Sequence, residues 1–311
     1  MDETANSNFN KTKNFLMDYA DAIGLSRKTR LNFYALTESL LKNDILHKTK
    51  FETSFKFNNG RISRQARFLY MDANAYSCKS KELFLLKLLH YRKIISETKG
   101  FKTNKLLFKA FEEISTKPMD LYFGADIAED DFVYAFWLIF GGVKKTGQVV
   151  LWPYNFRGII KNFFRTLQLK NPQILDEQIL NLGVDIYKNK TFYKIYYLLR
   201  GVNESLMDFS KVIKKIDKEM SGLGYYYFYS HMFDHSLKCI KKKVYLEFTN
   251  HDLIFNSNKT KEVLKGILSS GGMYSHWRSL YDMLKPVRGR ISILSIEPDM
   301  TITFYMRAIG L

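Results

Sequence analysis

Cysteine and proline are scarce in this sequence, which contains two and five of them among 311 residues. The cysteines, Cys78 and Cys239, are too few for a disulfide framework, and neither lies in a Cys-x-x-Cys zinc pattern. We therefore expect two reduced thiols in a cytoplasmic protein. The sequence also lacks an apolar run long enough to span a membrane, and its polar start, Met1-Asp2-Glu3-Thr4, has no apolar core of a secretory signal.

No stretch rich in proline, glycine or serine divides the chain, so we expect one domain over residues 1–311. Within it, residues 1–48 are expected to form a helical segment packed on the rest. Nucleotide-binding sequences of the Gly-x-Gly-x-x-Gly or Walker type are absent. His231 and His235 lie at the end of a predicted strand rather than on a helix, so we interpret them as turn residues and not as a metal-binding pair.

Positive charge is abundant, because 48 lysines and arginines against 31 aspartates and glutamates leave a net charge of +17. Such a balance attracts nucleic acids, anionic membranes, acidic peptides or phosphorylated ligands. The charge is spread through helical patterns such as residues 79–93 and 211–218, where lysines alternate with apolar residues. The simplest interpretation is a solvated lysine face, since a nucleic-acid binder should gather its charge on one surface.

Apolar and polar residues alternate with period two in ten stretches, which come in pairs joined by turn sequences. The first turn, Asn58-Asn59-Gly60, contains the Asn-Gly pair that is the strongest short hairpin signal. The predicted hairpins are Phe51–Phe57 with Ile62–Asp72, Asp120–Ile127 with Phe132–Phe140, Leu182–Tyr187 with Thr191–Leu199, Tyr225–Met232 with Lys242–Thr249, and Arg290–Ile296 with Thr301–Ala308. Helical patterns fill the gaps, and the predicted helices are Ser26–Lys42, Lys81–Ser96, Phe101–Ile114, Phe156–Leu167, Glu204–Met220 and Lys259–Leu268.

Ten antiparallel strands must hide their edges, and closing them into a barrel with the helices outside does so. We therefore expect an α/β protein built as a closed ten-stranded antiparallel β-barrel of five β-hairpins surrounded by α-helices. One face of each strand is apolar and would pack under the helices, whereas the other mixes tyrosine with charged residues, as in Asp120, Tyr122 and Asp126. A ten-stranded barrel is wider than the eight-stranded kind, so these mixed faces would line a lumen able to hold a ligand.

The residues of this predicted lumen are compatible with one kind of chemistry. Tyrosine rings stabilise a nearby cation by about 0.5–2 kcal/mol each, lysine and arginine bind a diphosphate, and a carboxylate accepts a proton. Transfer of an isoprenoid carbocation from its diphosphate requires these three parts. A tyrosine-rich core with hydrogen-bonded hydroxyls has the same composition and is the alternative.

Several segments also resemble those of a known family. The segment Phe51-Glu52-Thr53-Ser54-Phe55-Lys56, followed by a turn and Ala66-Arg67-Phe68-Leu69, resembles the first hairpin of the cyanobactin-type peptide prenyltransferases, which have the ABBA fold of a helix-ringed antiparallel barrel. Gly183-Val184-Asp185-Ile186-Tyr187 is similar to a Gly-aromatic-Asp-aromatic-Tyr strand of that family, and Gly124-Ala125-Asp126-Ile127 to its Gly-x-Asp strand. Phe228–Met232, Tyr245 and Asp252-Leu253 follow the order of its fourth hairpin.

The resemblance implies a peptide prenyltransferase, which moves a dimethylallyl or geranyl group from its diphosphate to a side chain or terminus of a small, ribosomally made and often macrocyclic peptide, with Mg²⁺ as cofactor. We expect a monomer with no membrane or nucleic-acid partner. By position, Glu52 would act as the base or orient the acceptor. The expected diphosphate-binding residues are Lys56, Arg67, Lys194 and Arg307, and the expected prenyl-pocket tyrosines are Tyr134, Tyr187, Tyr196, Tyr227, Tyr245 and Tyr305. Asp126 and Asp185 are candidate magnesium ligands, although they suit hydrogen bonds to the backbone at the barrel rim as well.

The sequence departs from the family pattern at two strands. The predicted strand Phe132–Phe140 has no basic residue where the family usually carries several, and Glu247-Phe248-Thr249-Asn250 ends a strand without the usual lysine and arginine. The basic residues from which a diphosphate clamp would then draw are Lys56, Arg67, Lys194, Arg200, Lys243, Arg290 and Arg307. The alternatives are a homologue with altered or no catalysis, an accessory protein that binds a precursor peptide, and a nucleic-acid binder. In the last, aromatics of the run 225–229 would stack on bases, but we expect Tyr225, Tyr227 and Tyr229 to share the lumen face, out of reach of a duplex.

Overall fold

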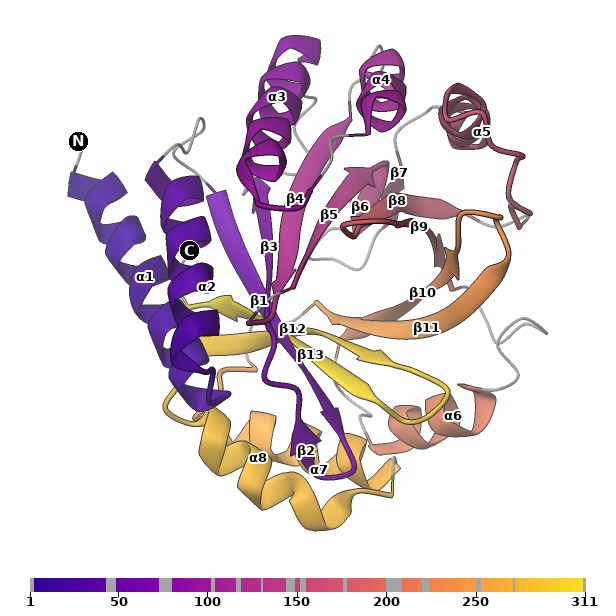
Figure 1. Cartoon of the computed structure of the whole chain (residues 1–311). Helices are drawn as coiled ribbons and strands as arrows, with labels where there is room; N and C mark the ends of the chain where they lie inside the picture. Colours follow the sequence, from indigo (N-terminus) through magenta and orange to yellow (C-terminus); the bar gives the residue numbers. More distant parts are fainter. Residues whose placement is uncertain are drawn as a thin grey trace.

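An antiparallel barrel surrounded by helices forms the structure, which is a computed structural model of the chain (Figure 1). It describes residues 3–42, 49–72, 80–101, 104–115, 119–129, 131–143, 149–151, 155–175, 178–199, 209–219, 224–249, 253–270 and 272–309. The predicted lumen residues that carry the proposed chemistry all lie within these ranges, whereas Arg200, Asp252 and the start of the predicted helix 204–220 lie outside them.

Five long hairpins build the barrel, as the sequence pattern predicted. Their strands are β1 (Thr49–Asn58) with β3 (Ala66–Asp72), β4 (Asp120–Ile127) with β5 (Phe132–Ile139), β8 (Ile179–Ile186) with β9 (Thr191–Leu198), β10 (Tyr225–Phe233) with β11 (Cys239–Phe248), and β12 (Gly289–Ile296) with β13 (Ile302–Ala308). Each hairpin pairs with the next, and β13 pairs with β1, which closes the sheet. The short strand β2 (Arg61–Ile62) pairs antiparallel with the end of β1. The strands β6 (Gly141–Val143) and β7 (Val149–Leu151) form a small separate sheet.

The first hairpin turn shows why the strands reverse where they do. Asn59 has φ 47° and Gly60 has φ 75°, so two consecutive residues adopt the left-handed region. That conformation belongs to the turn type whose twist matches the flanking strands, and asparagine followed by glycine adopts it at the lowest cost. The prediction made from Asn58-Asn59-Gly60 is therefore confirmed, with a short irregular stretch leading into β3.

Eight α-helices in the described residues surround the barrel. They are α1 (Glu3–Ala22), α2 (Arg27–Lys42), α3 (Lys81–Glu97), α4 (Lys105–Ile114), α5 (Phe156–Thr166), α6 (Ser210–Glu219), α7 (Asn258–Ser270) and α8 (Trp277–Leu284). Side chains of Ser80, Asn104 and Asn155 cap α3, α4 and α5 by accepting hydrogen bonds from backbone N–H groups of the first turn. Bounds were predicted for six of these helices, α1 was expected only as part of a helical segment over residues 1–48, and α8 was not predicted. The apolar stripe of α1 is short and interrupted by polar residues. Phe15 and Tyr19 pack it against the rest of the protein and are fully buried.

The core lies between the outer face of the barrel and the helices. In β4, the outward-facing Leu121 and Phe123 are 1% and 0% exposed and belong to one continuous apolar cluster that includes helix residues. The inward faces are less sealed: the side chain of Asp126 on β4 is 26% exposed, and that of Arg67 on β3 is 20% exposed, although both lie inside the barrel wall. Water therefore reaches the inner face, as the prediction of a ligand-sized lumen requires.

Candidate active site

Aromatic side chains cover the middle of the inner barrel face. Phe228 and Tyr245 stack with ring centroids 4.6 Å apart, and Tyr245 lies 5.6 Å from Tyr196 and 6.2 Å from Tyr305. These rings form an apolar cluster of their own, separate from the core outside the barrel. Because several π faces are gathered around one region of the lumen, this aromatic cluster can stabilise a cation placed between them.

A group of basic side chains lies on the inner face toward the hairpin turns. Lys56 comes two residues before the first turn, and Arg67, Lys194 and Lys243 reach the same region from β3, β9 and β11. Lys241 completes the group, which we call the lysine–arginine cluster: Lys56, Arg67, Lys194, Lys241 and Lys243. It is suited to an anion with several charged oxygens, such as a diphosphate.

Three carboxylates hold most of this cluster in place. Arg67 forms an ion pair with Asp126 and Lys194 with Asp185, and in each case the attraction outweighs burial, so the pKa of the cation is raised. Glu297 bridges Lys241 and Lys243, at 2.6 Å from the latter. Among the residues that the structure describes, Lys56 has no carboxylate within ion-pair distance. With every group ionised, five cations and three carboxylates leave an excess of two positive charges.

The pKa values of Lys243 and Glu297 are both lowered, which disfavours the charged form of the lysine but favours that of the glutamate. Burial lowers the pKa of Lys243 to about 7, helped by the nearby charges of Arg67 and Lys56 and opposed by Glu297. Burial alone would raise the pKa of Glu297, but its two lysines hold that pKa at about 2. Lys243 therefore changes its charge near neutral pH while its partner stays ionised, so an arriving anion favours the protonated lysine.

A second polar group occupies the opposite end of the inner face, four residues along β1 from Lys56. Glu52 is 2% exposed, and both Arg307 Nε and Ser292 Oγ donate to its Oε2 atom at 2.7 Å. Glu247 lies beside this group, accepts a hydrogen bond from the hydroxyl of Tyr226, and has its pKa raised by burial. This end therefore offers carboxylate groups to a nucleophile placed next to the aromatic cluster.

The structure brings most of the predicted site residues together but separates one from its expected partners. Lys56, Arg67 and Lys194 share the lysine–arginine cluster, whereas Arg307 pairs with Glu52 at the far end. Four residues of strand place Arg307 about 13 Å along β13 from Thr303, which lies opposite Lys56. The structure therefore separates Arg307 in depth from the other three residues expected in the diphosphate clamp, although it lies on the inner face as they do.

Two of the six predicted pocket tyrosines face the wrong way. The ring of Tyr134 packs against Phe101 outside the barrel, and its hydroxyl lies 2.5 Å from Thr98 at the end of α3. Tyr227 also faces outward, and it shares Asp217 of α6 with Tyr225 through hydroxyl hydrogen bonds. Both strands carry aromatic residues on both faces, so period-two alternation cannot tell their inside from their outside.

Tyr196, Tyr245 and Tyr305 do line the lumen, and Tyr187 lies at the turn end of β8 with the Lys190 ammonium 5.3 Å from its ring centre. The face that we expected to enclose Tyr225 and Tyr229 is the outer one, and Tyr226 and Phe228 point inward instead. Because α6 covers that outer face, the rings do not form the exposed stacking platform that nucleic-acid binding needs.

Sequence reasoning missed four contributors to the lumen: Lys241, Trp137, Ser292 and Tyr226. Alternation shows that Trp137 belongs to the inner face of β5, but its partners lie on other strands. A bulge between Ile291 and Ile293 turns Ser292 toward Glu52, and the sequence has no pattern that predicts this bulge.

The described residues do not fit a protein-held magnesium site. Asp126 and Asp185, the candidates from sequence, are each paired with a cation of the cluster. No group of three or more histidine, cysteine, aspartate or glutamate side chains that suits a metal ion occurs in the described part of the chain. Mg²⁺ prefers several oxygen ligands, and here lysine and arginine supply the positive charge that an anion would meet.

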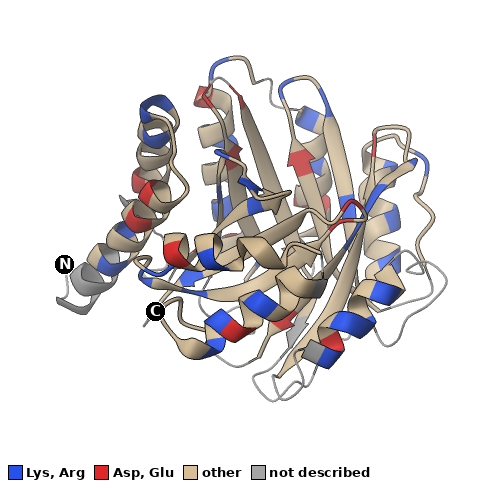
Figure 2. Cartoon of the chain, turned by 90° about the horizontal axis from the view of Figure 1, so that it is seen from below, with Lys and Arg blue, Asp and Glu red and all other residues tan. Residues whose placement is uncertain are grey.

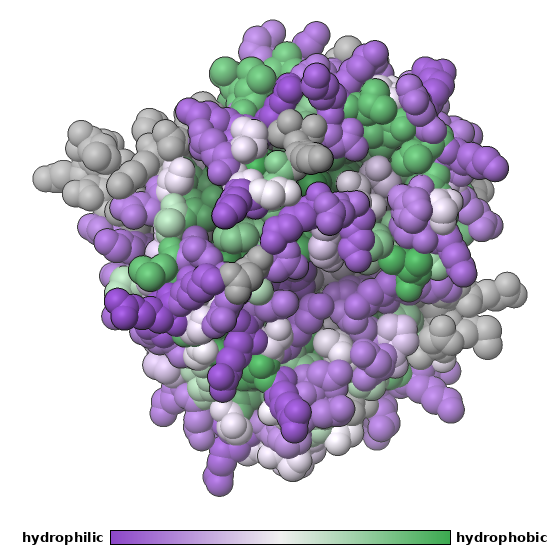
Figure 3. All heavy atoms as spheres, in the orientation of Figure 1, coloured by the Kyte–Doolittle hydropathy of each residue, from purple (hydrophilic) through white to green (hydrophobic). Residues whose placement is uncertain are grey.

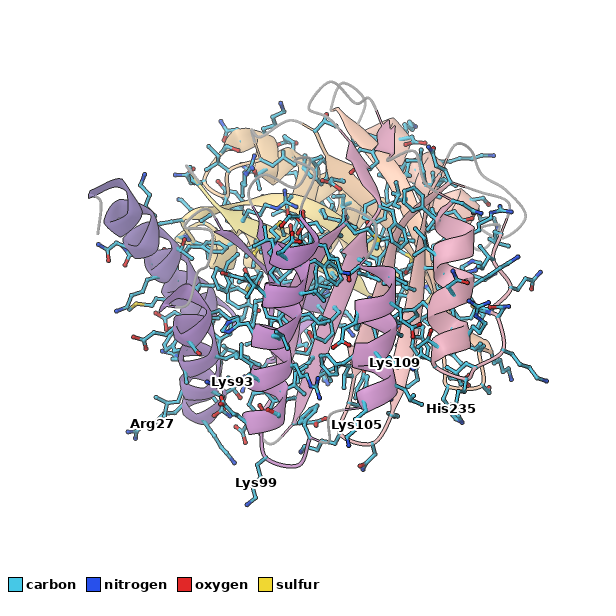
Figure 4. The ribbon with its side chains drawn as sticks, turned by 90° about the horizontal axis from the view of Figure 1, so that it is seen from above. Arg27, Lys93, Lys99, Lys105, Lys109 and His235 are labelled. Atoms are coloured by element: carbon cyan, nitrogen blue, oxygen red, sulfur yellow. The ribbon has the colours of Figure 1, made fainter. Side chains whose placement is uncertain are left out.

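The exterior carries charge of both signs. Blue and red segments alternate along the helices in Figure 2, and hydrophobic patches are interrupted by hydrophilic side chains in Figure 3. Figure 4 shows a row of basic residues that project outward near one edge of the molecule: Arg27, Lys93, Lys99, Lys105, Lys109 and His235. Lys93 and Lys109 in this row lie 3.9 and 3.8 Å from Glu97 and Glu113, so part of its charge is neutralised. Among the described helices, none combines the length and apolar character that crossing a bilayer requires.

Comparison with solved structures identifies the fold. The chain is similar over 96% of its length to 5-dimethylallyltryptophan synthase from Streptomyces coelicolor, with a TM-score of 0.63, 13% identity and 96% of that chain covered. PriB in a binary complex with product diphosphate gives a TM-score of 0.64, with 13% identity and 96% of that chain covered. AnaPT from Neosartorya fischeri gives a TM-score of 0.58, with 10% identity and 92% of that chain covered. A scan of protein-family models and a search of curated proteins found no match. The chain therefore has the fold of the ABBA prenyltransferases, and its barrel is the one expected from the sequence.

Proposed function

We propose that the chain is a prenyltransferase that uses an isoprenyl diphosphate as donor. The observation that carries this proposal is the order of three groups along the inner face: the lysine–arginine cluster near the turns, the aromatic cluster in the middle, and Glu52 at the far end. A diphosphate, an allyl cation and a nucleophile that loses a proton require these groups in this order. Solved structures of the same fold support it, since one holds product diphosphate and another holds DMASPP with Trp.

In this proposal the donor lies along the lumen with its diphosphate on the lysine–arginine cluster. The bond between the first prenyl carbon and the diphosphate oxygen breaks, and its electron pair leaves with the diphosphate, whose growing charge the cations stabilise. The allyl cation then lies between the rings of Tyr196, Tyr245 and Tyr305.

The acceptor enters from the side of Glu52. Its nucleophilic atom forms the new bond to the allyl cation and releases a proton, which Glu52 accepts through the carboxylate that Arg307 and Ser292 hold in place. Since both of these donors contact Oε2, the other oxygen remains to face the acceptor. Glu52→Gln keeps the shape but removes the base, so it separates catalysis from binding.

We further propose a small peptide as the acceptor. The support is the resemblance of the segments around Glu52, Asp126 and Asp185 to peptide prenyltransferases, together with the complex of NotF, of the same fold, with brevianamide F and DMSPP. Free tryptophan is the competing acceptor, since a neighbour of the same fold was solved with Trp. A screen of linear and cyclic peptides against free tryptophan distinguishes the two.

The test begins with calorimetric titration of non-hydrolysable dimethylallyl and geranyl diphosphate analogues, each with and without Mg²⁺. Binding that weakens by about tenfold or more in Arg67→Met would support a donor in the lumen, and transfer to a peptide would establish the activity. If neither analogue binds, the donor assignment is wrong. A protein that binds a precursor peptide yet leaves the diphosphate uncleaved would be the inactive homologue instead.

A further inference from the structure

Trp137 occupies a special position on the inner face of β5. It pairs with Tyr122 of β4 on one side and Gly183 of β8 on the other. Its indole lies so close to two glycines that a Cβ on Gly124 would be 3.0 Å from ring atom Cζ3, and a Cβ on Gly183 would be 3.4 Å from Cδ1. The ring therefore spans the wall from β8 to β4, and a side chain at Gly124 would clash with it and with the backbone oxygen of Phe68.

A hydrogen bond holds the indole in this place. Its Nε1–H donates to the hydroxyl of Tyr196 at 3.1 Å. A Cβ on Gly183 would lie 3.2 Å from the Tyr196 ring, so a side chain there would press on the partner of this hydrogen bond. Trp137 is thus fixed by contacts on three strands and has little freedom to swing aside.

Two apolar groups meet at this ring. One is the aromatic cluster, with Tyr196, Phe228 and Tyr245, and the other consists of Met71, Tyr122 and Ile139, with Leu69 packed against them. Among the described residues, Trp137 alone packs against both groups. We call the second group the apolar patch; Trp137 stands between it and the place where the allyl cation would form.

We propose that Trp137 limits the length of the prenyl donor, so that the protein favours dimethylallyl over geranyl diphosphate. This inference rests on the proposed function, since it assumes a donor tail in the aromatic cluster. One more isoprene unit must extend beyond the rings, and the apolar patch is the apolar surface on that side, but the fixed indole covers it. Removing the indole joins the two groups into one longer pocket.

The test compares the two diphosphate analogues in calorimetry on the whole chain. The wild-type protein should bind the dimethylallyl analogue more tightly, and Trp137→Ala should shift the ratio of the two dissociation constants toward geranyl by about tenfold or more, the scale on which an apolar pocket discriminates length. Trp137→Leu tests the same opening with less loss of apolar volume if the alanine variant does not fold. Ile293→Ala is the matched control, because it removes bulk beside the aromatic cluster but not toward the apolar patch.

The outcomes separate this inference from the function on which it rests. If both analogues bind and the ratio is the same in folded Trp137→Ala and Trp137→Leu, the length limit is wrong and the donor site stands. The same conclusion follows if Ile293→Ala shifts the ratio as much as Trp137→Ala does. If neither analogue binds to the wild-type protein, both proposals fail. A double variant that adds Ile139→Phe to Trp137→Ala should restore the preference for dimethylallyl by refilling the pocket.

Discussion

Replacing Arg67 by methionine tests whether the lysine–arginine cluster binds the diphosphate of the donor. The substitution keeps the length of the side chain and removes its charge, so packing in the lumen changes little. Arg67 is paired with Asp126 and interacts electrostatically with Lys56, Lys194 and Lys243. Without it, the excess charge of the lysine–arginine cluster falls from two to one, and Asp126 faces the diphosphate uncompensated.

The expected size of the effect follows from these contacts. A hydrogen bond to a charged group contributes about 1.5–3 kcal/mol, and about 1.4 kcal/mol corresponds to a tenfold change in affinity. Loss of the Arg67 contact alone should therefore weaken donor binding by about 10- to 150-fold. Adding Asp126→Asn removes the uncompensated carboxylate and returns the excess charge to two, so the double variant should recover about tenfold of that loss.

Calorimetric titration with the dimethylallyl analogue measures both variants, and thermal unfolding checks that they fold. The affinity of the wild-type protein should also fall with added salt more steeply than that of Arg67→Met, because fewer charges remain to be screened. Donor affinity within about threefold of wild type in a folded Arg67→Met protein would refute the assignment, since no charge-assisted contact of this kind is so weak. Equal loss in the single and double variants would show that Asp126 is not the source of the added repulsion.

Three further predictions concern catalysis, pH and the rings. Glu52→Gln should lower the turnover rate by about 100-fold or more while leaving the dissociation constant of the donor analogue within about threefold of wild type. If turnover rate and donor affinity fall equally, Glu52 is not the base. Because burial lowers the pKa of Lys243 to about 7, its ammonium is charged at pH 6 and mostly neutral at pH 8, so donor binding should weaken across that interval, and titrations of Lys243→Met should show a flatter profile. Tyr245→Leu should slow transfer by about tenfold through loss of one cation-stabilising ring. Tyr227→Leu, outside the barrel, should leave donor binding unchanged. If Tyr227→Leu has the larger effect of the two variants, the inner face assigned here is contradicted.

The barrel could be predicted from the sequence because strands and turns are signalled by residues close together along the chain. Alternation with period two and turn residues such as Asn59-Gly60 act over a few neighbours, and the structure has strands at the five predicted hairpins. Closure followed from the cost of exposed sheet edges, which holds for any chain with this many antiparallel strands. Helix α1 shows the limit, since its bounds within the expected helical segment 1–48 were not predicted, and its short apolar stripe is buried by docking through Phe15 and Tyr19.

The site was predicted in part, and the errors have a common physical cause. Alternation assigns residues to one of two faces, and this sufficed for Lys56, because β1 has one apolar and one polar face, and for Arg67 and Lys194, because each alternates with outward-facing core residues such as Phe68 and Tyr193. It failed for Tyr134 and Tyr227, where both faces are aromatic and only the position of α3 and α6 decides which side is covered.

Depth along the barrel axis is the second quantity that alternation does not contain. Arg307 was predicted on the correct face, yet its register opposite Glu52 places it far from the cations near the turns. Glu297 and Lys243 meet because β11 and β12 are paired in one particular register, and Trp137 reaches two glycines on neighbouring strands for the same reason. The sequence by itself therefore determined the strands, their turns and the polar character of the lumen, since these depend on neighbours along the chain. Only the tertiary structure decided which side chains share a depth, because that depends on the stagger of strands far apart in sequence.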